Sequence, residues 1–175
     1  MTMTPGVRKF ALTVHVTSSV GWLGSVAAFL GLAVTGLTSR DAHKVRSAYI
    51  GMELTGQYVI VPLSFASLIT GLVQALGTTW GLFRHYWVLA KLLINVLATA
   101  LLLLHMRPIS HMASLAIAGK LSVSDHRNVQ VQLVADAGLA LVALVAATAF
   151  SIYKPRGLTS YGRRRLREQR ALPPS

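Results

Sequence analysis

The chain has 175 residues, of which 53% are hydrophobic and only 13% are charged, whereas a soluble domain has about 25% charged residues. Cysteine is absent, which excludes disulfide bonds, thiolate metal sites and cysteine nucleophiles. The net charge is +12, and seven of the 17 lysine and arginine residues follow residue 153. Most of the others flank apolar blocks, where basic residues set membrane topology and contact anionic headgroups. Composition therefore indicates an integral membrane protein without a nucleic-acid partner.

Four apolar blocks are long enough to supply the roughly 20 residues that a helix needs to cross the hydrocarbon core. They are residues 10–37, 48–76, 83–106 and 131–153. The first two are long enough to tilt or to project beyond the bilayer. The run after Arg8 and Lys9 is too long for a cleaved signal peptide, so we expect it to be retained. The predicted fold class is all-α, an up-down four-helix bundle over residues 1–153 with a basic tail at 154–175.

The distribution of basic residues predicts the orientation. Four spans place both termini on one side, which carries eleven basic residues against six on the other: Arg8, Lys9, Arg84, Lys91 and seven within 154–170, against Arg40, Lys44, Arg46, Arg107, Lys120 and Arg127. The positive-inside rule then predicts a multi-pass protein of the bacterial cytoplasmic membrane with both termini in the cytoplasm. The tail is expected to lie on anionic headgroups as a disordered or weakly helical arm, with a soluble partner as the alternative.

The connection between the third and fourth spans contains ISHMASLAIAGKL, residues 109–121. Its mixture of apolar and small polar residues predicts a short interfacial helix. Ser124 or Asp125 could cap the fourth span.

Helical periodicity sorts the polar residues of each span into a stripe. Small and polar residues belong at helix contacts within lipid, so most of these stripes are expected to be packing surfaces. The stripes are His15, Ser18, Ser19 and Trp22; Glu53, Gln57, Ser64, Ser67 and Gly71; Arg84, Lys91, Asn95 and His105; and Gln132, Asp136, Ala140, Ala143 and Ala147.

The ionisable members fall into two layers, and the layer near the termini is basic and contains no carboxylate. In one interpretation Lys91 reaches the interface by snorkelling, and Arg84 and Trp87 anchor the helix end. In the other, His15 and His85 ligate a haem b iron from diagonal helices, and Lys91 and Arg84 face the haem propionates. A quinone or another anionic headgroup is a further candidate. His85 lies about 120° around its helix from Lys91, which counts against the haem geometry.

The layer away from the termini contains the two acidic residues of the spans. A buried polar network is predicted here, in which Glu53, Asp136 and His105 share hydrogen bonds, and Gln57 and Asn95 extend the set of buried polar residues. Copper is the alternative, because histidine and methionine suit Cu(I). Its candidate ligands are His105, Met106, His111 and Met112.

Three stretches carry a resemblance to known proteins: LTVHVTSSVGWLGSVAAFLGLAV, VIVPLSFASLITGLVQALGTTWGLFRHYWVLAKLL and ATALLLLHM. Over residues 10–115 the chain resembles an uncharacterised family of small actinobacterial four-helix membrane proteins, which implies the fold but no activity. The histidine of the first span, followed by GWLG, is more distantly similar to the copper-resistance D-type membrane proteins and their haem-binding relatives. That second resemblance implies only that His15 could be a haem or metal ligand.

The leading hypothesis is a haem-binding membrane protein for electron transfer or haem handling, with a quinone or another redox partner. The alternative is a non-redox accessory or transport-related protein, linked to copper through the outer histidines and methionines. No hydrolytic triad or HExxH motif is present, which argues against a conventional membrane hydrolase and leaves enzyme activity open. A homo-oligomer is compatible with either hypothesis.

Overall fold

The computed structural model describes residues 3–77, 85–120 and 127–153, together with 157, 159, 160, 162–164 and 167. Apart from His85 and the turn at Ala118 and Gly119, the residues with described secondary structure in these three long ranges are helical. The elements are α1 (Pro5–Thr38), α2 (Ala42–Thr55), the π-helical segment η1 (Gly56–Ile60), α3 (Val61–Gly77), α4 (Tyr86–Ile117) and α5 (Arg127–Tyr153). Since η1 joins α2 to α3 without a break, these elements form four rods. Ser124, Asp125 and most of the basic tail lie outside the described residues.

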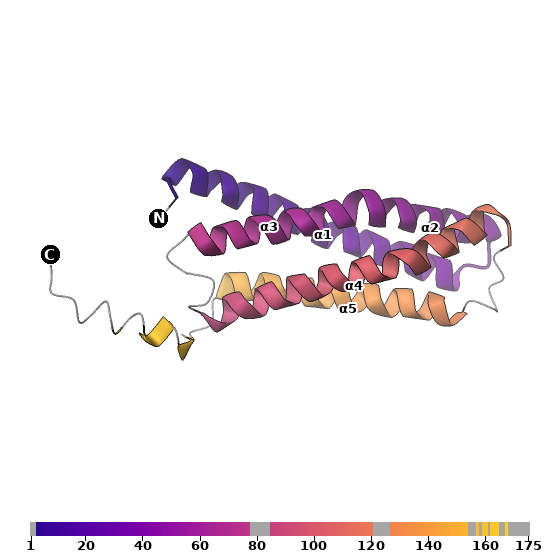
Figure 1. Ribbon diagram of the computed structural model, residues 1–175. Helices are drawn as coiled ribbons and strands as arrows, with labels where there is room; N and C mark the ends of the chain where they lie inside the picture. The colour runs from indigo at the N-terminus through magenta and orange to yellow at the C-terminus, as the bar shows by residue number, and fades with distance from the viewer. Residues whose placement is uncertain are drawn as a thin grey trace.

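The four rods run up and down in an antiparallel bundle (Figure 1). The helix α1 packs against the α2–α3 rod and against α5, and α4 packs against the same two rods. The rods α1 and α4 are therefore diagonal to each other, which confirms the predicted bundle. We call the end with Pro5, Gly77, Tyr86 and Tyr153 the terminal end, and the other the hairpin end.

Each rod is long and apolar enough to cross a membrane. Large apolar side chains such as Phe10, Leu104 and Leu139 are exposed on the outside of the bundle, as expected for a surface that faces lipid. The rods are longer than the apolar blocks of the sequence. The largest difference is at the third rod, where the apolar block ends at Met106 but α4 ends at Ile117.

The predicted interfacial helix after the third span is not a separate element. Residues 109–117 continue α4 without interruption, although Pro108 lies inside the helix. Ile109, Met112, Ala113 and Ala116 are buried, and their helical spacing gives this extension an apolar stripe against α2. The extension then ends in a Schellman motif: Gly119 has a φ of 67°, and the Lys120 N–H donates to the Leu115 carbonyl at 3.0 Å.

The π-helical segment changes which residues of the second rod face the bundle. Met52 and Ser64 are both buried, yet a regular helix at ~100° per residue would place them about 120° apart. A π turn contains an extra residue, and this removes most of the offset. The interior face consequently runs through Met52, Gly56, Ile60 and Ser64, while Gln57 is exposed.

The tightest packing lies at the hairpin end. Tyr49, Met52, Ile109 and Met112 are at most 1% exposed. Asp41 begins α2 as its N-cap, because its carboxylate accepts the His43 N–H at 2.9 Å. The opposite, terminal end of the bundle is hollow, and the candidate site lies there.

Candidate functional site

A cavity of about 730 Å³ lies at the terminal end and is lined by residues of all four rods. This volume is within the range of pockets that hold drug-sized ligands, about 300–1,000 Å³. None of the described residues that line it is acidic. Its polar lining includes Arg8, His15, Lys91, Asn95 and Ser151.

The imidazole of His15 is fixed by the second rod. Its Nδ1 lies 3.1 Å from the Ser67 carbonyl oxygen and 3.1 Å from Thr70 Oγ1. A carbonyl oxygen can only accept, so Nδ1 carries the proton and Nε2 presents its lone pair to the cavity. A Cβ on Gly71 would lie 3.0 Å from His15 Cε1, so the glycine leaves room for the ring.

Lys91 points into the bundle. Its ammonium group donates to Ser151 Oγ at 2.7 Å and lies 3.4 Å from His15 Nε2. One helical turn further along α4, Asn95 is only 7% exposed, and its side chain takes part in no hydrogen bond within the described chain. The cavity therefore presents a cation, an imidazole lone pair and an unpartnered amide to the same space.

Of the residues predicted for this layer, the structure brings His15 and Lys91 together. His85 immediately precedes α4, and its ring lies against Trp87 with the centroids 6.2 Å apart. His85 is not among the lining residues of the cavity. Arg84 lies outside the described residues.

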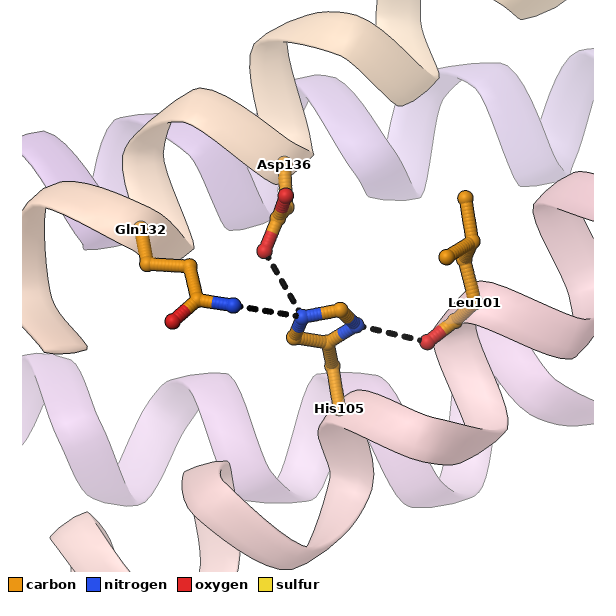
Figure 2. Close-up of polar contacts among 4 residues, drawn as sticks. All are labelled: Leu101, His105, Gln132 and Asp136. Carbon is orange, nitrogen blue, oxygen red and sulfur yellow. Dashed lines mark hydrogen bonds and ion pairs between the residues drawn. The ribbon is translucent and has the colours of Figure 1, made fainter.

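The other ionisable layer contains a His105–Asp136 pair between α4 and α5 (Figure 2). His105 Nδ1 lies 2.8 Å from the Leu101 carbonyl oxygen, and His105 Nε2 lies 2.8 Å from Asp136 Oδ2. The second contact is an ion-pair approach, because Oδ2 makes no well-directed hydrogen bond. Gln132 Nε2 also approaches His105 Nε2, at 3.2 Å. Since a carbonyl oxygen can only accept, Nδ1 donates to Leu101 and Nε2 is the atom that faces Asp136 and Gln132.

The remaining predicted residues of this layer are dispersed. Glu53 is half-buried and Gln57 is exposed, and neither side chain forms a hydrogen bond or ion pair within the described chain. Asn95 lies in the first cavity, so the four residues predicted as a buried polar network are not in one place.

The predicted copper ligands are also separated. Met112 is fully buried and His111 is exposed. The sulfur of Met106 packs on Gly56, where a Cβ would lie 3.2 Å away. Among the described residues, no cluster of three or more His, Asp or Glu side chains is arranged to hold a metal ion. Copper binding stays a prediction without support from this arrangement.

Sequence reasoning missed two contacts of the Lys91 site. Ser151 continues the predicted stripe of the fourth span one turn beyond Ala147, so its spacing was a usable signal. The Ser67 carbonyl that fixes His15 is a backbone atom, and no residue type reveals such a partner.

Comparison with known proteins returned no matching family model, no matching curated protein and no matching solved structure. The four-helix architecture implied by the sequence resemblance is present.

Proposed function

We propose that this chain is a four-span protein of the bacterial cytoplasmic membrane, with both termini in the cytoplasm, that binds the anionic headgroup of an amphipathic ligand. The observation that carries the proposal is the inward Lys91, which has no carboxylate among the described lining residues of its cavity. A charged side chain inside a membrane costs a few kcal/mol and usually has a partner or a function. A ligand anion would supply that partner, and the Asn95 amide N–H could donate to the same headgroup, while the His15 Nε2 lone pair would accept from Lys91. An ionised quinone belongs to this ligand class.

Haem b is the second candidate, because His15 has one feature of an iron ligand. Such histidines usually donate the other ring N–H to a carbonyl or carboxylate, as His15 does to Ser67. Haem would supply one-electron chemistry to the protein. Lys91 would have to leave Nε2 and turn to a propionate, which Arg8 could also meet. The fit is partial, since His85 does not line the cavity.

Two of the three tryptophans, Trp22 and Trp87, line the cavity, so a brominated ligand that enters it should quench fluorescence. We expect ω-bromoundecanoate to quench the detergent-purified protein at about tenfold lower concentration than the neutral ω-bromoundecanol. Lys91→Met should abolish this preference, whereas Lys120→Met at the exposed hairpin end should preserve it. A preference that survives in Lys91→Met would refute the proposal.

Haem is tested separately by the absorption spectrum after expression with a haem precursor. A Soret band that shifts on reduction and is lost in His15→Ala would establish the second candidate. A colourless protein would exclude haem. A preference for the carboxylate ligand would then show that the site binds an anionic headgroup that is not a haem propionate.

A further inference from the structure

A second cavity of about 290 Å³ lies between α4 and α5, against α1. We call it the slot. Its lining is apolar except at one place, where His105 and Asp136 face it. Three of its lining residues, Leu97, Leu101 and Leu139, are about half or more exposed on the outside of the bundle. The slot is therefore an apolar space within the spans that borders the lipid-facing surface.

The slot adjoins the cavity at Lys91. Trp22, which is 2% exposed, lines both spaces. On α4, Asn95 lines the first cavity and its neighbour Ile94 lines the slot. On α5, Leu144 lines the first cavity and Ala143 lines the slot. The polar cavity and the apolar slot thus follow one another along the same two helices, with the Trp22 indole at their junction.

The cavity that contains Lys91 suits an anionic headgroup, and the adjoining apolar slot suits a hydrocarbon tail, so together they match an amphiphile. Lys91 and His105 are 14 residues apart on α4, which corresponds to roughly 21 Å at ~1.5 Å per residue. A space of 290 Å³ holds roughly ten groups of water or methylene size, at ~30 Å³ each. That is sufficient for one hydrocarbon chain and too small for the two chains of a phospholipid.

We propose that the slot receives the hydrocarbon tail of a single-chain anionic amphiphile whose headgroup is held at Lys91. This inference rests on the proposed function and names its ligand class. The slot ends at Ile109 and Leu133, about one helical turn beyond the His105–Asp136 pair, and its volume limits the tail to about ten carbons. Each further methylene of the tail contacts more of the apolar lining until the slot is full, so binding is expected to depend on chain length.

The test fills the slot and varies the length of the ligand. Ala140 lines the slot but not the first cavity, so Ala140→Phe should block the tail and leave the headgroup site intact. We expect it to weaken quenching by ω-bromoundecanoate about tenfold and to leave quenching by the short ω-bromohexanoate within twofold. Retained binding of the short ligand also shows that the variant is folded, and Ala143→Leu provides a smaller blockage with the same expected pattern.

The matched control is Ala135→Phe, an equal substitution at an exposed position of α5 that does not line the slot. It should leave both affinities unchanged. If Ala140→Phe and Ala143→Leu bind the long carboxylate as tightly as this control does, the slot does not hold the tail. That result would leave the Lys91-dependent preference for carboxylate intact, so the two proposals fail separately.

Discussion

At the residue scale, Gly36 makes a close contact with the buried ring of Tyr49. A Cβ on Gly36 would lie 3.0 Å from Tyr49 Cζ and 3.1 Å from its hydroxyl oxygen, and Tyr49 is only 1% exposed. We expect Gly36→Ala to destabilise the protein by about 1–3 kcal/mol, the usual cost of overpacking. The midpoint of thermal unfolding in detergent, followed by circular dichroism, measures this. A Cβ on Gly31 of the same helix would have no neighbouring atom within 4 Å, so Gly31→Ala should leave the midpoint of unfolding unchanged or raise it. Equal midpoints for the two variants would contradict the argument.

Individual side chains also show how far the sequence predicts the site. The polar stripe that contains Lys91 could be recognised, because residues on one helix have a fixed angular relation. The side chain that faces His15 could not be recognised from the sequence. His85 was expected in that position, but the structure shows Lys91 there. Contacts between helices depend on the rotation of each rod about its own axis. Packing of the whole bundle sets this rotation, and a polar stripe alone leaves it undetermined.

At the scale of the element, η1 explains why the predicted stripe of the second span differs from the observed one. Regular helical spacing placed Glu53 and Gln57 on the same face as Ser64 and Ser67. The π turn rotates the first half of the rod relative to the second, so Met52 and Gly56 face inward instead. Nothing in the composition of GQYVI marks it as π-helical. The π turn could have been detected from the apolar residues, because they form a more continuous stripe when one residue within 56–60 is omitted from the helical count.

The same segment predicts an unusual tolerance to deletion. Without Gln57, which is exposed, the rod can become a regular α-helix, and Met52 and Ser64 still share a face at ~100° per residue. We expect this variant to fold with a modest loss of thermal stability. Deletion of the exposed Leu97 in α4 should instead prevent folding, because it rotates every later residue of that helix out of register. The yield of monodisperse protein in size-exclusion chromatography compares the two, and equal yields would refute the role given to η1.

At the scale of the whole molecule, the two ends of the bundle differ in packing. The hairpin end holds the fully buried Tyr49, Met52 and Met112, and the terminal end holds the cavity. Residues 107–117 extend α4 beyond its apolar block by roughly 16 Å. Hydropathy could predict where the chain enters lipid, but it could not predict this extension, because hydropathy measures contact with lipid and not helix length. The extension is expected to project into water at the hairpin end.

The absence of cysteine allows this orientation to be tested with single thiols. Ser114 in the α4 extension and Ser160 beyond α5 are both exposed and lie at opposite ends of the bundle. If the termini are cytoplasmic, a membrane-impermeant maleimide should label Ser114→Cys in intact cells. It should label Ser160→Cys only after the membrane is permeabilised, and the cysteine-free parent chain gives the background. The reverse pattern would place the basic end outside the cell, and labelling of neither thiol after permeabilisation would place both positions within lipid.

Because the positive-inside bias depends mainly on seven basic residues after residue 153, replacing those residues by glutamine should weaken or invert the labelling pattern.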